Sequence, residues 1–230
     1  MDIRISKYEL KEYLGKQLDC FFPDKYSFQG NDIDRAFELA LEKLENCFKY
    51  IIFPAYSNAL GQTFFNHLHA DQYAQFLYFF SNCLWKVSQN SPICDKVIYL
   101  NRAINGFYFS YKCELPDIFF FDHPVGSIIG NASYHDYLVV MQGVTINTAQ
   151  DKNGETAPYL GKGLYLATGA SVIGNKRIGD RVSIGVNATA YNKEIADDNV
   201  VVLDEESGKM IIRRRKKEYC KAQDCFRSRI

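Results

Sequence analysis

Aliphatic side chains recur at every sixth position through residues 159–191, a stretch too rich in glycine to form a helix. The period runs without a slip through Leu160, Leu166, Val172, Ile178, Ile184 and Ala190. Such a period gives each short strand one inward side chain, and about three strands close one triangular coil. Because stacked coils share a thin apolar core, the stretch predicts a parallel β-helix rather than an ordinary all-β domain with chance spacing.

The six-residue phase also extends upstream of this stretch. Leu138 and Val144 keep it. Near Gly106 the helical periodicity of the sequence ends, and the chain becomes rich in β-branched and aromatic residues. The polar segment NTAQDKNGETAP, residues 147–158, interrupts the period and predicts an excursion that leaves the coil and returns to it. We therefore assign residues 106–202 to the β-helix.

Residues 1–105 have the periodicity of helices. Ser6 is followed three residues later by Glu9, a capping-box pattern at a helix start. The segment NDIDRAFELALEKLENCFKYI places apolar residues on one face at helical spacing, and residues 69–87 and 91–105 predict two more helices. The expected fold class is α+β, with an N-terminal helical domain followed by a parallel β-helix.

Residues 203–230 form a basic tail. Its segment MIIRRRKKEYCKAQDCFRSRI carries eight Lys or Arg residues against two acidic ones. Such a run is either a solvated end or an anion contact. The anion could be the coenzyme phosphates, an acidic polysaccharide or a membrane surface met peripherally.

Composition limits the remaining classes of function. The chain has 27 basic and 27 acidic side chains, and this balance argues against general nucleic-acid binding. No apolar run approaches the roughly 18 residues of a membrane-spanning helix, and the charged N-terminal segment is not a secretory signal. The seven scattered cysteines include no C-x-x-C pair. We expect reduced thiols and a cytoplasmic protein.

Two segments of the coil region carry a family resemblance. FDHPVGSIIGNASYHDYLVVMQGVTINT and GKGLYLATGASVIGNKRIGDRVSIG resemble the left-handed β-helix, or hexapeptide-repeat, acyltransferases. Within them, the chain is most similar to the serine acetyltransferase branch, which several surface-polysaccharide sugar O-acetyltransferases also resemble. The resemblance implies a left-handed coil, acetyl transfer from acetyl-CoA to a hydroxyl, and a homotrimer with sites between subunits.

The same resemblance assigns a general base. In the family, this base is the histidine of an Asp-His pair at the start of the coils, here Asp122 and His123. A neutral imidazole is well matched to taking the proton of a hydroxyl at neutral pH. His135, the other histidine of the coil region, is expected at a coil corner or in the acceptor site. A metal site of the β-helical carbonic anhydrase kind needs three histidines, so we expect no metal.

The residue that orients the base departs from the family pattern. The family places an aspartate fifteen residues before the histidine, and here that position is Tyr108. A tyrosine can hydrogen-bond an imidazole but carries no fixed charge. Glu114, Asp117 and Asp122 are the candidate carboxylate partners of His123, and the sequence does not choose among them.

The acceptor site departs from the pattern as well. In serine acetyltransferases, an Arg-His pair precedes a proline at the end of the excursion, and the arginine binds the carboxylate of serine. Thr156 and Ala157 hold those positions here, so we predict a sugar acceptor in a bacterial capsule or O-antigen polysaccharide or its precursor. Thr156 and His135 are the expected acceptor-binding residues. Serine O-acetylation in cysteine biosynthesis and an inactive β-helix scaffold stay open as alternatives.

The resemblance also implies a path for the coenzyme. In the family, the pantetheine arm of acetyl-CoA runs along the groove between neighbouring coils, held by backbone groups at small residues. The matching positions in this sequence are Asn147, Thr148, Ala167, Thr168, Gly185 and Val186.

Overall fold

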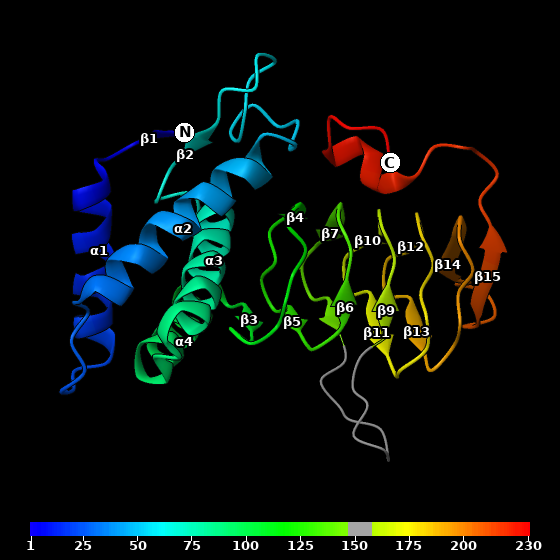
Figure 1. Cartoon of the computed structure of the whole chain (residues 1–230). Coiled ribbons are helices and arrows are strands. Elements are labelled where there is room, and N and C mark those ends of the chain that lie inside the picture. The colour runs from blue at the N-terminus through cyan, green and yellow to red at the C-terminus, as the bar shows by residue number, and fades with distance from the viewer. Residues whose placement is uncertain (147–157) are drawn as a thin grey trace.

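The computed structural model describes residues 1–146 and 158–230 of the chain. Helices occupy the N-terminal half and short strands wind into a coil through the C-terminal half (Figure 1). Asn147, Thr148 and Thr156, three of the predicted ligand-binding residues, lie outside the described residues, as does Ala157.

The helical half is built around one central helix. The α-helices of the described residues are α1 (Lys7–Phe21), α2 (Asn31–Phe48), α3 (Ala70–Ser88) and α4 (Ser91–Asn105), and a short parallel pair joins β1 (Asp2–Ile3) to β2 (Phe64–Phe65). Ser6 begins α1 with the expected capping box, since its hydroxyl accepts the backbone N–H of Glu9. Helix α3 packs against both α2 and α4, and its residues 71–84 are all buried.

The coil is made of three ladders of parallel strands. One ladder contains β4 (Phe119–Phe121), β7 (Leu138–Val140), β10 (Tyr165–Leu166), β12 (Ser183–Ile184) and β14 (Asn199–Leu203). A second contains β3 (Tyr108–Phe109), β5 (Ile128–Ile129), β8 (Thr145–Ile146), β11 (Ser171–Ile173) and β13 (Thr189–Tyr191). The third pairs β6 (Ser133–Tyr134) with β9 (Tyr159–Leu160) and continues through single bridges at Ile178 and Ile195.

The aliphatic residues of the six-residue period fill the interior of this coil. Each of the six lies at most 3% exposed, and successive members belong to successive ladders. Leu166 is in register with Ile184 in one ladder, and Val172 is in register with Ala190 in another. The ladders therefore form the parallel coil that the period predicts, with one thin core shared by all the turns.

Buried polar side chains of α3 close the open edge of the first coil. The amide of Gln75 donates to the carbonyl of Phe119 at 3.2 Å, and the hydroxyl of Tyr78 donates to that of Cys113 at 3.0 Å. Asn82 donates in the same way to the carbonyl of Tyr111 at 2.9 Å. An exposed edge leaves backbone groups unpaired, and these contacts supply partners for three of its carbonyls.

The basic tail returns to the rest of the molecule, while most of its Lys and Arg side chains stay exposed to solvent. It forms β15 (Met210–Arg214), antiparallel to β14, and then the short 3-10 helix η1 (Lys221–Cys225), which lies back over the coil (Figure 1). The backbone N–H of Ile52 donates to Cys225, and that of Arg227 donates to Tyr50, so the tail reaches the helical half.

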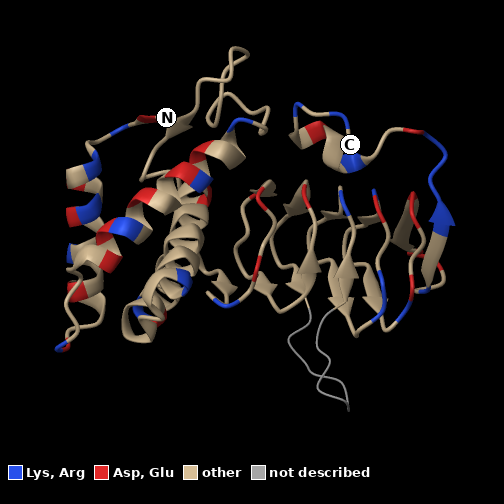
Figure 2. Cartoon of the chain, in the orientation of Figure 1, with Lys and Arg blue, Asp and Glu red and all other residues tan. Residues whose placement is uncertain are grey.

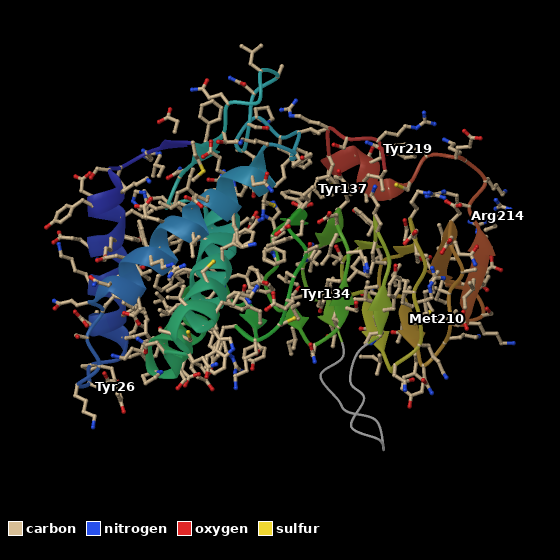
Figure 3. All side chains as sticks on the ribbon, in the orientation of Figure 1. Tyr26, Tyr134, Tyr137, Met210, Arg214 and Tyr219 are labelled. Atoms are coloured by element: carbon tan, nitrogen blue, oxygen red, sulfur yellow. The ribbon has the colours of Figure 1, made fainter. Side chains whose placement is uncertain are left out.

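A side-chain contact fixes this return of the tail. Tyr137 of the coil lies beside η1, with its ring 5.2 Å from that of Phe226 (Figure 3). Lysines and arginines nevertheless remain concentrated along the tail (Figure 2). None of the helices among the described residues is long and apolar enough to cross a membrane.

Gly161 lies where two turns of the coil approach closely. Its backbone N–H donates to the carbonyl of Ile178 at 2.9 Å, and a Cβ built on it would lie 2.4 Å from the carbonyl oxygen of Gly179. The carbonyl oxygen that such a Cβ would meet belongs to the backbone, and it cannot rotate away as the end of a flexible side chain could. The position is therefore restricted to glycine by space.

We expect Gly161→Ala to destabilise the fold by about 1–3 kcal/mol, the usual cost of overpacking. Thermal unfolding at fixed protein concentration should show a lower Tm, by about 2–4 °C for each kcal/mol. Lys176→Ala, at an exposed coil position, is the matched control and should leave Tm almost unchanged. Equal Tm values for the two variants would contradict the close approach of the turns.

Candidate active site

Asp122 and His123 lie at the corner of the coil that follows β4. The backbone N–H of Asp122 donates to the carbonyl of Val140 at 2.9 Å, which stacks this corner on the next turn. His123 has a positive φ of 51°, uncommon for a residue with a side chain, and its carbonyl accepts the N–H of Val125 at 2.7 Å. The turn leaves the imidazole 77% exposed, open to a substrate.

A carboxylate from the helical half meets this imidazole. Oδ2 of Asp71, in the first turn of α3, lies 3.0 Å from Nδ1 of His123. The Asp71 side chain is 9% exposed, in contrast to the open ring that it contacts. Asp122 lies toward the other ring nitrogen, with its Oδ1 3.9 Å from Nε2, beyond hydrogen-bond distance.

The two aspartates create a negative environment around His123. Burial raises the pKa of Asp122 above its usual value, with a smaller contribution from Asp71, while the neighbouring His123 opposes the rise. Burial also raises the pKa of Tyr56 well above its usual value, and the charges of Asp71 and Asp122 add to this effect. The Tyr56 hydroxyl is buried and has no hydrogen-bond partner among the described residues.

Two of the predicted carboxylate partners of His123 lie elsewhere. The Glu114 carboxylate pairs with Lys86, and that of Asp117 pairs with Lys43 at 3.0 Å. Both carboxylates are more than half exposed, so lysines and water satisfy them. Neither is the partner of His123 in this structure, and the residue in contact with Nδ1, Asp71, was not among the candidates.

His135, one of the two predicted acceptor residues, lies away from His123 within the same chain. His135 follows β6, at a different corner of the triangular coil, and its Nδ1 lies 3.0 Å from the carbonyl oxygen of Leu160. Its ring centroid is 4.4 Å from that of Tyr159. Thr156 lies outside the described residues, so the structure does not place it.

The described coenzyme positions stack beneath the Asp122–His123 corner. At each turn, a backbone N–H donates to a carbonyl of the next turn. The bonds run from Met141 to Leu166 at 3.1 Å, from Ala167 to Ile184 at 3.0 Å and from Gly185 to Val201 at 2.8 Å. Thr168 and Val186 therefore lie in the same column of corners as His123, and Val186 is 59% exposed. Met141 and Gln142 occupy the turn next to His123, and the following two turns of the column offer the smaller residues Ala167, Thr168 and Gly185 together with Val186.

One cluster of possible metal ligands lies in the part of the chain that the structure describes. It consists of Asp71, Asp122 and His123, whose ligand atoms lie within 4.8 Å of one another. The Nδ1 of His123 and the Oδ2 of Asp71, 3.0 Å apart, form a direct contact between imidazole and carboxylate. The arrangement therefore suits an imidazole held by a carboxylate, with its other nitrogen free for proton transfer.

No family model matches the chain. Among curated proteins, it is 30% identical over 119 residues to a serine acetyltransferase of Synechococcus elongatus, covering 51% of this chain and 49% of the relative. It is 32% identical over 103 residues to a serine acetyltransferase of Staphylococcus xylosus, covering 44% of this chain and 48% of the relative. The chain thus spans about half of the length of the curated relatives it matches.

Solved structures extend the likeness to nearly the whole chain. Serine acetyltransferase from Vibrio cholerae superposes with a TM-score of 0.70, covering 95% of this chain and 83% of that one at 16% identity. Serine acetyltransferase isoform 3 from Entamoeba histolytica, in complex with cysteine, superposes with a TM-score of 0.57. The match covers 86% of this chain and 71% of that one at 18% identity. The chain shares the fold of these proteins.

These likenesses overturn the predicted sugar acceptor. The cited curated relatives and solved structures are named serine acetyltransferase, which favours the alternative of serine O-acetylation. The sugar prediction rested on Thr156 and Ala157 at the positions of an Arg-His pair. It assumed that a carboxylate-binding group must come from those two positions. The expected link to capsule or O-antigen polysaccharide is therefore wrong.

We expect Asp122→Asn to stabilise the folded protein at neutral pH. Because the folded-state pKa of Asp122 is raised, the wild-type chain loses stability as pH rises from the unfolded-state value through the folded-state one. The amide that replaces the Asp122 carboxyl stays neutral, so the variant does not lose stability in this way as pH rises. Its advantage in unfolding free energy should be present at pH 7 and disappear below about pH 3, where the carboxyl is neutral in both states.

Urea denaturation at both pH values measures this difference. Asp117→Asn, which removes an exposed carboxylate paired with Lys43, is the control and should show no gain at pH 7. Lower stability of Asp122→Asn than of wild type at pH 7 would mean that attraction to His123 outweighs the cost of burial.

Proposed function

We propose that this chain is a serine O-acetyltransferase, which transfers the acetyl group of acetyl-CoA to the hydroxyl of L-serine. One observation carries the proposal: an exposed imidazole, contacted by a buried carboxylate, heads a column of small coil-corner residues. The likeness to proteins named serine acetyltransferase supports it, including serine as the acceptor.

His123 is the general base of the proposed reaction. Its Nε2 takes the proton of the serine hydroxyl while the hydroxyl oxygen attacks the thioester carbonyl carbon. Backbone N–H groups stabilise the negative charge that forms on the carbonyl oxygen. The intermediate then breaks its C–S bond, and the imidazolium returns the proton to the leaving sulfur. The products are O-acetylserine and free CoA.

Asp122 supplies charge on the acceptor side of the imidazole. Its carboxylate lies 3.9 Å from Nε2 and is 34% exposed, so it faces the position at which the acceptor hydroxyl must sit. Free serine carries an ammonium group two carbons from its hydroxyl, and a carboxylate is its natural partner. We assign Asp122 to this contact.

The coenzyme binds along the column of corners in this proposal. Ala167, Thr168, Gly185 and Val186 offer backbone groups to the pantetheine arm, which places the thioester next to His123. One coil supplies only one wall of such a groove. The proposed assembly is therefore a homotrimer of left-handed coils, with the second wall contributed by a neighbouring subunit.

We expect His123→Ala to lower kcat by about 10²–10⁴-fold, the usual contribution of a positioned general base. The assay follows release of the CoA thiol from acetyl-CoA with L-serine as acceptor. Asp117→Asn, which removes an exposed carboxylate paired with Lys43, is the control and should keep kcat within about threefold of wild type. A loss below about fivefold in His123→Ala would contradict the assignment of the base.

The acceptor is tested with the same assay. The wild-type protein should release CoA with L-serine and not with capsule or O-antigen polysaccharide. If no CoA is released with L-serine while acetyl-CoA still binds, serine acetylation would be contradicted and the inactive scaffold favoured.

A further inference from the structure

We propose that Asp71 is the positioning residue of the catalytic histidine, so that the helical half supplies a necessary part of the active site. This inference rests on the proposed function, because it takes His123 to be the base. It gives a role to a residue that lies 52 positions before the histidine and on a different structural unit.

The placement of Asp71 is that of a built contact. Its carboxylate is 9% exposed, and burying a carboxylate is costly unless a partner is provided. The Nδ1 of His123, 3.0 Å away, is that partner. Asp71 also belongs to the first turn of α3, where the free backbone N–H groups of a helix favour a negative charge.

The contact fixes which imidazole nitrogen carries the proton. An ionised carboxylate only accepts hydrogen bonds, so Nδ1 must be protonated to meet Asp71. The neutral ring then has its lone pair on Nε2, the atom that must take the proton of the acceptor hydroxyl. A carboxylate on Nδ1 also stabilises the imidazolium that forms during the reaction.

The coil provides no other carboxylate at this nitrogen among the described residues. The carboxylates of Glu114 and Asp117 pair with lysines. The Asp122 carboxylate lies on the Nε2 side of the ring, at 3.9 Å, and so is not the partner of Nδ1. Tyr108, at the position where the family carries its aspartate, faces the Arg102 guanidinium at 6.0 Å. Asp71 therefore replaces, from the helical half, a charge that the coil lacks.

The expected effect of Asp71→Asn is a loss of about 10²–10⁴-fold in kcat with L-serine, because an amide can donate to Nδ1 and favour the wrong tautomer. The KM for acetyl-CoA should change by less than about threefold, since Asp71 is proposed to act through His123 and not on the coenzyme. Asp117→Asn is the control for loss of a carboxylate and should keep wild-type kcat.

The second readout is the tautomer itself. Nitrogen-15 NMR of histidine-labelled protein at about pH 8.5, where an ordinary histidine is neutral, reports which ring nitrogen of His123 is protonated. The chain has four histidines, and His123→Gln identifies the signal of interest. We expect the proton on Nδ1 in the wild type and a shift toward Nε2 in Asp71→Asn.

Both changes are required for the proposal to stand. A fall in kcat with an unchanged tautomer would make Asp71 merely structural, and an altered tautomer with wild-type kcat would make the contact dispensable. If Asp71→Asn does not fold, the wild-type spectrum decides, because a proton on Nε2 would overturn the proposal. If the wild type does not acetylate serine, the proposed function fails while the tautomer still tests the contact.

Discussion

The unpaired edge of the first coil is the constraint on which the rest of the molecule depends. A stack of parallel turns must end somewhere, and its first strands present backbone groups with no neighbouring turn. Here the edge is covered by α3, whose Gln75, Tyr78 and Asn82 hydrogen-bond to its carbonyls. Ring contacts between Phe79 and Phe119 reinforce the joint. Because β4 leads directly into the Asp122–His123 corner, the same joint places the candidate base against α3.

Much of the coil could be predicted from sequence, because its period is a direct consequence of its geometry. One inward side chain per short strand leaves a regular aliphatic signal, and the helical half carries an equally regular pattern with a capping box. The carboxylate partner of His123 could not be found in this way, since a search along the coil sequence considers only nearby acids. A usable signal was nevertheless present. Asp71, Gln75, Tyr78 and Asn82 follow one another at helical spacing within an otherwise apolar, aromatic helix.

The incorrect acceptor prediction has a physical cause. It treated a missing charge at Thr156 and Ala157 as evidence about the substrate, although groups distant in sequence can meet at one site. The contact between Asp71 and His123 is an example of such a meeting within this chain. Local motifs therefore predicted His123 as the candidate base, while the groups around it depend on how the two halves dock.

The return of the tail to the helical half has a consequence for how the chain folds. Arg227 hydrogen-bonds to Ser57 across 170 residues of sequence, and Ile51 bridges Phe226. The turns of the coil can each form on the preceding one as the chain leaves the ribosome, whereas this closure must wait until residues 225–227 have been synthesised. Contacts of such large sequence separation form late and slowly. The helical half therefore spends most of translation with one of its surfaces still uncovered, at the stage when chaperones and proteases act on new chains.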